Sequence, residues 1–542
     1  MKARLANAAW LASCRPEWLR FARAADRLRA TQEQLLLQYL RTNARTEYGV
    51  QNRFAAIHSV REYQSQVPLT SYTDYEACMR RIGEGVPRVL TAESVRLFEV
   101  SSGSASASKL IPYTGRLRSE FHRGIAPWIH NLYTNVPAVQ GGTAYWSVTP
   151  LIAGKAFTSG GVPIGFESDS AYLGPLGQWL GRTIMAVPDS VKYAADVDAF
   201  RYATLFHLLH HPDLCLISVW NPTFLTLLLE PLAKWWASLV EDIGTGCMRP
   251  PHAEAPTASR YAPDPALARR LGKLGPAEYG AIWPALAVIS CWADGASTPY
   301  VRRVAERFPG VMVQGKGLLA TEAFVSLPLV GVNGGVLAAN SHFFEFIDEA
   351  GEAHLAHQLA KGRTYSVVIT TGGGLYRYRL YDVVEITGHW KELPCLRFVG
   401  KEDHISDWFG EKLEEHFVSQ ALQRVFEAHE MDANFAMLAP EDMRDRAGYV
   451  LYVECGAGFD APNLALAVDA ALRSNFHYDY CRKLGQLEPV RIARVKDGVA
   501  AYLRACQQRG QKLGNIKPAV LQQTTGWRTL FELQTGSTAA RS

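Results

Sequence analysis

The spacing of apolar and polar residues changes along the chain and predicts two differently built regions after a helical start. The first 60 residues follow a helical spacing with little sign of strands. Between residues 90 and 400, short β-rich runs alternate with longer helical patterns, which indicates an α/β domain. The clearest strands are predicted over 144–148, 216–220 and 287–290, and the clearest helix over 197–209.

After about Phe398 the pattern becomes that of a small α+β domain. We therefore predict an α/β protein with a large N-terminal domain, residues 1–398, and a smaller C-terminal domain, residues 399–542. The small domain is predicted to contain helices over 411–429 and 464–476, strands over 449–453 and 490–495, and a last helix that ends near Gln508.

Local signals refine this layout. Thr31 and Gln34 have the spacing of a capping box ahead of Leu35, which predicts that a helix begins there. The Asn333-Gly334 pair predicts a hairpin turn, because such residues adopt a positive φ at low cost. A surface loop is predicted where prolines cluster, at Pro250, Pro251, Pro256, Pro263 and Pro265.

The N-terminal residues allow two interpretations. Lys2 and Arg4 precede a short apolar run that ends in a segment resembling a lipoprotein cleavage site, Leu11 to Cys14. Asn7 interrupts that run, however, and the helical pattern continues beyond it. An ordinary N-terminal helix is the favoured prediction.

Composition narrows the class of protein. The 542-residue chain is 48% hydrophobic and 20% charged, which is ordinary for a globular protein, and its net charge of +4 is too small to favour nucleic acid or a membrane surface. Nine dispersed cysteines without a CxxC pair fit a reducing compartment. No apolar run approaches the roughly 20 residues that span a bilayer. We expect a cytoplasmic protein, with a monomer favoured.

Three segments carry residue types suited to a nucleotide. Residues 101–109 follow a strand-like run, and their backbone N–H groups together with Lys109 could hold phosphate, although they form no Walker loop. Thr321 and Glu322 offer a hydroxyl for phosphate and a carboxylate for Mg²⁺. Residues 370–384 contain three glycines and Asp382, whose carboxylate could bind ribose hydroxyls. Taken alone, each segment is more often an ordinary loop or hairpin.

Three further features are weaker. Residues 400–412 lie at the predicted domain boundary and suit a hinge as well as a solvated connection. Lys517 precedes a proline and could project into a cleft, although a plain surface lysine is the commoner reading. A metal site at one helical face is disfavoured, because no acidic residue completes the motif formed by His207, His210 and His211.

In this order, the segments resemble the auxin-responsive (Gretchen Hagen) family of acyl acid amido synthetases, within the adenylate-forming superfamily. The resemblance includes the superfamily's phosphate loop, its Thr-Glu pair and its ribose-binding aspartate, and it extends over about 350 residues. Each marker is weak alone, but their common order makes the resemblance specific. The matching segments are 46–49, 67–75, 101–114, 220–225, 290–295, 319–322, 376–382 and 396–400.

The resemblance implies roles in binding ATP and Mg²⁺ within the large domain. Thr321 would contact the α-phosphate, Glu322 would hold Mg²⁺ and Asp382 would bind the ribose. The phosphates would be cradled by the loop residues Ser101, Ser102, Gly103 and Ser104, with Lys109.

Further roles follow for the small domain. Lys401 matches a basic residue, usually arginine, that also reaches the nucleotide, and Asp403 falls at the hinge position. Lys517 matches the lysine that swings in for adenylation, although the arginine that usually follows the proline is missing, and Lys512 competes for this role.

The phosphate loop and the Thr-Glu segment depart from the family pattern. Ser104 replaces threonine, Ser106 stands where glycine is common, and Ala323 follows Glu322 where glycine is usual. A Cβ at a tight turn limits φ, so these changes are expected to slow phosphate handling.

The resemblance implies a two-step reaction with ATP and Mg²⁺. A carboxylic acid is activated as acyl-AMP, and the amine of an amino acid then takes the acyl group and releases AMP. Two alternatives stay open: the same adenylation with coenzyme A or another thiol as acceptor, and a nucleotide-binding protein whose catalysis has decayed. The altered loop at Ser104 and Ser106 motivates the second alternative.

Overall fold

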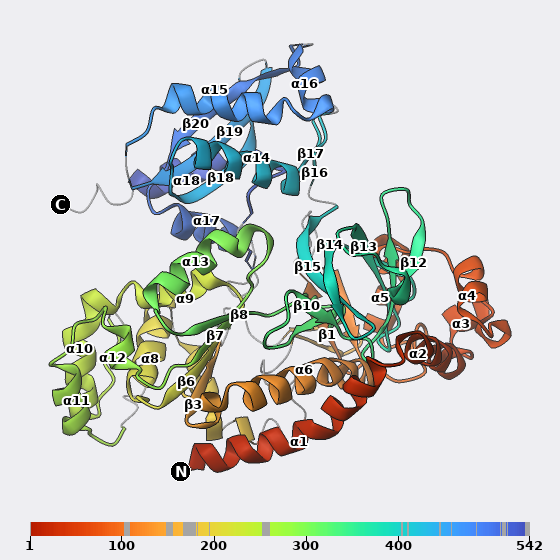
Figure 1. Ribbon diagram of the computed structural model, residues 1–542, viewed down its shortest axis with the longest axis horizontal. Coiled ribbons are helices and arrows are strands. Elements are labelled where there is room, and N and C mark those ends of the chain that lie inside the picture. Colours follow the sequence, from red (N-terminus) through yellow and green to blue (C-terminus); the bar gives the residue numbers. More distant parts are fainter. Residues whose placement is uncertain are drawn as a thin grey trace. The chain divides into compact units, whose positions relative to one another are not determined.

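The structure is a computed structural model of the chain, and it divides into two compact units (Figure 1). The first unit comprises Met1–Asp294 and Pro299–Phe398, and the second comprises Gly295–Thr298 and Val399–Ser542. The structure describes all residues except 1, 102–108, 148–155, 166–179, 182, 195, 252–260, 403–404, 409–410, 444–445, 457, 484, 510, 512–515, 518 and 537–542.

A parallel four-stranded sheet forms the α/β part of the first unit. Its strand order is β3-β6-β7-β8, and each neighbouring pair is parallel. Every residue of β6 and β7 is buried, as expected for a parallel sheet that is covered on both faces. The strands are β3 (Thr143–Trp146), β6 (Leu214–Ser218), β7 (Val288–Cys291) and β8 (Met312–Gly315).

Helices of the first unit bury the predicted apolar positions. The helix predicted over 197–209 is confirmed as α8, and the three predicted strands are confirmed as β3, β6 and β7. Helices α1 and α6 lie side by side, and α6 packs its apolar face into the main core (Figure 1). The helices are α1 (Lys2–Ala24), α2 (Leu28–Asn43), α3 (Glu47–Gln51), α4 (Val60–Gln66), α5 (Glu76–Gly83), α6 (Gly115–Asn135), α8 (Val197–Leu209), α9 (Pro222–Leu229), α10 (Leu232–Thr245), α11 (Pro265–Leu271), α12 (Tyr279–Ile282) and α13 (Thr298–Arg307).

Two further sheets complete the first unit. A seven-stranded sheet has the order β12-β11-β13-β14-β15-β10-β9, and a four-stranded sheet has the order β2-β1-β5-β4. The Asn333-Gly334 turn is confirmed, because Gly334 has a φ of 86° between the antiparallel strands β9 and β10. The strands are β1 (Leu97–Ser101), β2 (Lys109–Tyr113), β4 (Ala156–Phe157), β5 (Pro163–Ile164), β9 (Ser326–Pro328), β10 (Gly335–Leu337), β11 (Phe343–Ile347), β12 (Ala353–Leu355), β13 (Thr364–Thr370), β14 (Tyr378–Trp390) and β15 (Leu393–Lys401).

The second unit is an α+β structure with its own core. In its three-stranded sheet, β18 pairs antiparallel with β19, and β20 lies parallel to β19 on the other side. Its elements are β16 (Ile405–Ser406), β17 (Leu413–Glu414), α14 (Glu415–Ala428), β18 (Ala433–Met443), β19 (Arg446–Cys455), α15 (Ala461–Leu472), α16 (Phe476–Lys483), β20 (Leu487–Arg494), α17 (Gly498–Gln508) and α18 (Trp527–Gly536).

Three local predictions were wrong. Helix α2 begins at Leu28 rather than after Thr31, because the Glu392 carboxylate accepts from the Leu28 N–H and satisfies this helix end from another part of the chain. Helix α18 follows the helix that was predicted to be last. Pro265 opens α11 instead of lying in a loop, since proline is tolerated in the first turn of a helix.

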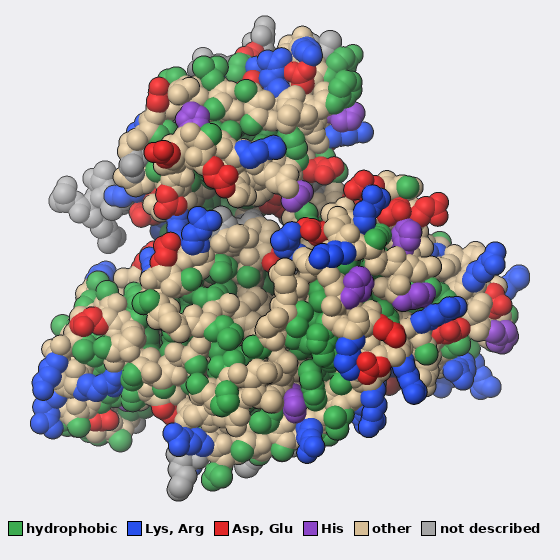
Figure 2. Space-filling view, viewed as in Figure 1, with side chains coloured by type: hydrophobic (Ala, Val, Ile, Leu, Met, Phe, Trp, Pro, Cys, Tyr) green, Lys and Arg blue, Asp and Glu red, His purple; other side chains and the backbone are tan. Residues whose placement is uncertain are grey.

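Over the part of the chain that the structure describes, no helix is both long and apolar enough to cross a membrane. On the face seen in Figure 2, Lys and Arg side chains form small separate groups, one over α10 and α11 and another over α2 to α4, with Asp and Glu between them.

Candidate active site

Strand β2 places one of the predicted site residues, Lys109, beside Tyr72. Ser101 and Lys109 are paired across β1 and β2, and the Lys109 Nζ lies 5.8 Å from the centre of the Tyr72 ring. Burial raises the pKa of Tyr72, the Leu110 N–H that it accepts opposes this, and the negative charges of Glu76 and Glu322 add to the rise. Lys109 therefore contacts the Tyr72 ring, and the charge of Glu322 raises the pKa of the same tyrosine. Ser102, Gly103, Ser104 and Ser106 lie outside the described residues.

A residue of strand β2 holds the backbone of the Thr321-Glu322 pair. The Tyr113 hydroxyl donates to the Thr321 carbonyl at 2.6 Å, which fixes the backbone of this pair. The Glu322 side chain is buried, whereas Thr321 is half-buried. Ala323 is fully buried and does not adopt a positive φ, so the cost expected for a Cβ after Glu322 does not arise here.

Asp382 lies in a bulge of β14. The register between β13 and β14 shifts between Ser366 and Val368, and Tyr381, just before Asp382, has a φ of 60°. A bulge re-aims the side chains of a strand and is frequent beside functional sites. The Asp382 carboxyl group is buried with 3% exposure.

Two family markers far apart in the sequence hold the start of β14. The Thr70 N–H donates to the Arg377 carbonyl at 2.9 Å, and the Arg379 N–H donates to the Thr70 carbonyl at 2.9 Å. The Arg377 guanidinium forms a buried ion pair with Glu345 at 3.0 Å. The 67–75 marker thus positions the strand that carries Asp382.

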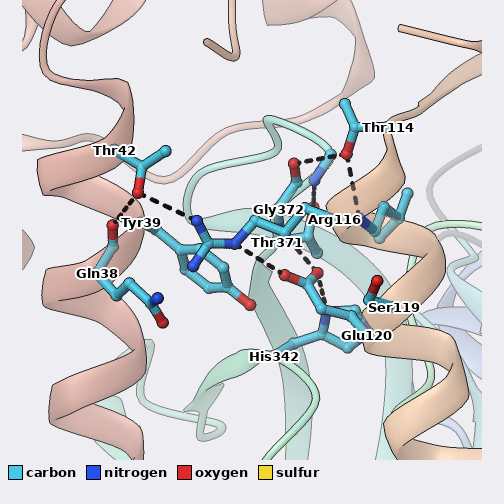
Figure 3. Close-up of polar contacts among 12 residues, drawn as sticks. Gln38, Tyr39, Thr42, Thr114, Arg116, Ser119, Glu120, His342, Thr371 and Gly372 are labelled. Carbon is cyan, nitrogen blue, oxygen red and sulfur yellow. Dashed lines mark hydrogen bonds and ion pairs between the residues drawn. The ribbon is translucent and has the colours of Figure 1, made fainter. Parts of the chain in front are cut away.

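A buried polar chain connects the Glu322 segment with the turn before β14, and Figure 3 shows its part around Glu120, His342 and Gly372. The Phe324 N–H donates to His342 Nε2 at 3.1 Å, which places the ring hydrogen on Nδ1, facing Glu120 at 3.1 Å. The Glu120 carboxylate also accepts from the Gly372 N–H at 2.9 Å. Because Glu120 and His342 are fully buried, this chain fixes both backbone segments.

Two of the three glycines at 372–374 serve this packing. A Cβ on Gly372 would lie 2.4 Å from Glu120 Oε1, and one on Gly373 would lie 2.8 Å from Leu117 Cδ2. Both neighbours belong to α6, so these two glycines are required by the approach of the turn to this helix.

The second unit carries the remaining predicted residues. Lys401 ends β15 and is half-buried, while Asp403 and Lys512 lie outside the described residues. Lys517 is exposed, and the Tyr502 hydroxyl donates to its carbonyl at 3.0 Å. The backbone at Lys517 is therefore fixed, while its side chain lies at the surface.

The three histidines at the end of α8 have separate partners. His207 contacts the Tyr261 hydroxyl at 3.0 Å, His210 contacts the Phe206 carbonyl at 2.8 Å, and His211 lies 3.4 Å from Asp213. Burial lowers the pKa of His207 to about 4. Among the described side chains no group of three or more could hold a metal ion.

Some residues of this region had no sequence signal as a group. Glu120 and His342 are separated by 222 positions, and the residues around neither of them predict their contact. Tyr113 lies in a family marker, but its contact with Thr321 joins β2 to the connection between β8 and β9, 208 positions away. Lys316 could have been noticed, because it is a lysine at the end of an apolar strand.

Known structures identify the class to which this fold belongs. The chain is similar to "AtGH3.15 acyl acid amido synthetase in complex with 2,4-DB", with a TM-score of 0.83, 20% identity and 96% of both chains covered. It is also similar to a 2-hydroxyisobutyryl-CoA ligase in the postadenylation state, with a TM-score of 0.53, 13% identity, and 95% of this chain and 93% of the other covered. The fold is that of the adenylate-forming ligases.

The family follows from the sequence. Residues 19–313 match the GH3 family N-terminal domain, residues 335–401 the central domain and residues 415–525 the C-terminal domain. The chain belongs to the GH3 family. Its relatives include a probable indole-3-acetic acid-amido synthetase, GH3.12, of Oryza sativa subsp. japonica, 26% identical over 72% of both chains. Jasmonoyl--L-amino acid synthetase JAR6 of Nicotiana attenuata is 25% identical over 68% of both chains.

Proposed function

We propose that this protein is an ATP- and Mg²⁺-dependent acyl acid amido synthetase, which activates a carboxylic acid as acyl-AMP and transfers the acyl group to an amino acid amine. The observation that carries this proposal is the match to all three GH3 domains. It is supported by the position of Lys109, 5.8 Å from the Tyr72 ring, and by the charge of Glu322, which contributes to the raised pKa of the same tyrosine, because adenylation needs a cation and a metal-binding carboxylate in one region.

The chemistry of the Thr321-Glu322 pair fits Mg²⁺. This ion is commonly bound by one or two carboxylates together with phosphate oxygens, and Glu322 is a carboxylate on a backbone that Tyr113 fixes. When bound, Mg²⁺ would neutralise negative charge on the phosphate oxygens.

The chain's own residues would then divide the work of adenylation. Lys109 and residues 101–104 would hold the phosphates, Thr321 would contact the α-phosphate, and Asp382 would bind the ribose. The carboxylate of the acid attacks the α-phosphorus, the bond to the bridging oxygen breaks, and pyrophosphate leaves. Pre-aligned charges accelerate this step because the negative charge on the phosphate changes as the new bond forms.

The second unit is proposed to move between the two reactions. Lys401 would reach the nucleotide, Asp403 would act as the hinge, and Lys517 would deliver positive charge during adenylation. The exposed side chain of Lys517 is compatible with such a role. The amine of the amino acid then attacks the acyl carbonyl, loses a proton, and AMP leaves.

The proposal is tested by incubating the protein with ATP, Mg²⁺, a panel of carboxylic acids and mixed amino acids, and measuring AMP and amide. Glu322→Ala should lower acid-dependent AMP formation by about 10²–10³-fold. The exposed carboxylate of Glu306 provides the matched control, and Glu306→Ala should leave the rate unchanged. A Glu322→Ala protein with full activity would contradict the assignment.

The acceptor is determined in the same experiment. Amino acids that accelerate turnover and appear in an amide product would support the proposed ligation. Acceleration by coenzyme A alone would show a thiol acceptor instead. ATP binding without AMP formation from any acid would show that catalysis has been lost.

A further inference from the structure

A lysine is buried at the end of the parallel sheet. Lys316 follows β8, and its side chain is only 9% exposed. Its Nζ donates a hydrogen bond of 2.7 Å to the Ser218 hydroxyl, at the end of β6. Burial lowers the pKa of Lys316 to about 7, which reflects the cost of a charged ammonium in apolar surroundings.

Aromatic faces enclose this amine. The Lys316 Nζ lies 5.2 Å from the centre of the Trp128 ring and 5.3 Å from that of Trp220. The Trp128 indole N–H donates to Gln314 at 2.9 Å, which fixes the orientation of this ring. The rings of Trp128 and Trp220 therefore both lie beside the buried Lys316 amine, which is a hydrogen-bond donor.

The amine has no acidic partner among the side chains that the structure describes. Its neighbours are the Ser218 hydroxyl, two indoles and Cys291, whose pKa burial raises to about 11, so that its thiol is neutral near pH 7. A buried ammonium is costly unless an anion compensates it.

The position of Lys316 in the sheet indicates that a bound ligand supplies the compensating anion. In open α/β sheets, ligands bind outside the carboxyl ends of the parallel strands. Ser218 ends β6 and Cys291 ends β7, and Lys316 directly follows β8. The amine thus lies at the edge of the sheet where a small-molecule substrate is expected.

We propose that Lys316 recognises a second anionic oxygen of the carboxylic acid substrate, so that the substrate class is planar aryl acids carrying a second carboxyl group. This inference rests on the proposed function. The reacting carboxylate would meet Thr321, which Tyr113 of the β1–β2 sheet holds, whereas Lys316 bonds to Ser218 of the parallel sheet. Thr321 and Lys316 both lie in the connection between β8 and β9, and each is held by a residue of a different sheet, so that each could serve one acidic group of the substrate.

The experiment compares pairs of acids by calorimetric titration of the full chain. Benzoate, phenylacetate and cinnamate are each paired with the same acid bearing a para carboxyl group. The unaltered protein should bind the substituted member of at least one pair about tenfold more tightly, as a charge-assisted hydrogen bond would give. Lys316→Met should abolish this preference without weakening the unsubstituted acid.

Controls separate recognition from folding and from catalysis. Lys273→Met removes an exposed lysine and should keep the preference. Lys316→Gln is the second variant if Lys316→Met does not fold, which thermal unfolding shows beforehand. AMP formation is measured in parallel, so a failure of the proposed function appears as an absence of AMP and leaves the binding comparison valid.

Three results would overturn the inference. The unaltered protein could bind both members of every pair equally, or bind none of the acids. Lys316→Met could weaken both members of a pair by the same factor, which would assign the lysine to the reacting carboxylate or to packing alone.

Discussion

Two buried cations show how single residues are held in this protein. Arg377 is paired with Glu345 at 3.0 Å and donates further to the carbonyls of Gln64 and Val67, both at 2.8 Å. Among the described side chains, the neighbours of Lys316 are a neutral hydroxyl, two aromatic faces and the Cys291 thiol. A paired buried charge is expensive to disturb, whereas an uncompensated one already destabilises the fold.

Glu345→Ala should lower the free energy of unfolding by about 3–5 kcal/mol, because it leaves the buried Arg377 without its anion. Urea denaturation measures this change. The exposed pair of Arg81 and Glu47 supplies the control, and Glu47→Ala should have little effect. Equal effects of the two substitutions would show that burial of the first pair does not matter.

Lys316→Met should stabilise the protein in a pH-dependent way. The pKa of Lys316 is lowered from 10.5 to about 7, so the unfolded chain binds more protons than the folded one between these values. The native protein therefore gains stability relative to the variant as pH rises from about 7 towards about 10.5. Denaturation curves at several pH values should show the largest benefit of Lys316→Met below pH 7. A benefit that is constant with pH would contradict this assignment.

At the scale of elements, α6 organises the candidate site. Glu120 and Gly124 lie one turn apart on this helix, and both face the segment after Glu322. Glu120 acts on it through His342, while Gly124 leaves room for the Phe324 ring. The position of Glu322 thus depends on a helix that contributes no proposed catalytic group.

Gly124→Ala should disturb the candidate site although Gly124 is not one of its proposed residues. The added Cβ would lie 2.3 Å from the Phe324 ring, so the ring and the segment bearing Glu322 must shift. Overpacking of this kind costs about 1–3 kcal/mol, and acid-dependent AMP formation should fall with it. Ser119→Ala, at an exposed position of the same helix, is the control. Unchanged activity in Gly124→Ala would show that the ring moves without displacing Glu322.

The sequence predicted elements where periodicity is strong and failed where other parts of the chain decide. Strands β6 and β7 were found because their positions are mostly apolar and all buried, and α8 was found from its helical pattern; in the structure Asp196 caps this helix. The start of α2 was missed because its partner, Glu392, is 364 positions away.

The same distinction applies to the candidate site. Thr321, Glu322 and Asp382 belong to local motifs and could be proposed from the sequence. The contacts of Glu120 with His342 and of Lys316 with Ser218 join distant segments, and only the folded chain brings them together. Sequence patterns identify the reacting groups better than the groups that hold them.

At the scale of the whole molecule, each unit has a core of its own. The core of the second unit is built from residues such as Leu422, Leu451 and Leu472, and it is separate from the clusters of the first unit. Such a protein need not unfold in one step.

Leu451→Ala should destabilise the second unit selectively. Leu451 is fully buried in β19, and its truncation should cost about 2–5 kcal/mol. Calorimetry should show one of two unfolding transitions moving to lower temperature while the other stays in place. Leu466→Ala, at an exposed leucine of α15, should move neither. A single transition that shifts as a whole would show that the units unfold together.

The conformation of Tyr381 also has a consequence for sequence variation. A φ of 60° is open to glycine and tolerated by asparagine or aspartate, but it is unfavourable for β-branched side chains. In a library of all substitutions, position 381 should accept glycine and asparagine while rejecting valine and isoleucine, the reverse of what a strand residue normally allows. The backbone conformation that positions Asp382 would thereby limit which residues can replace Tyr381 during evolution.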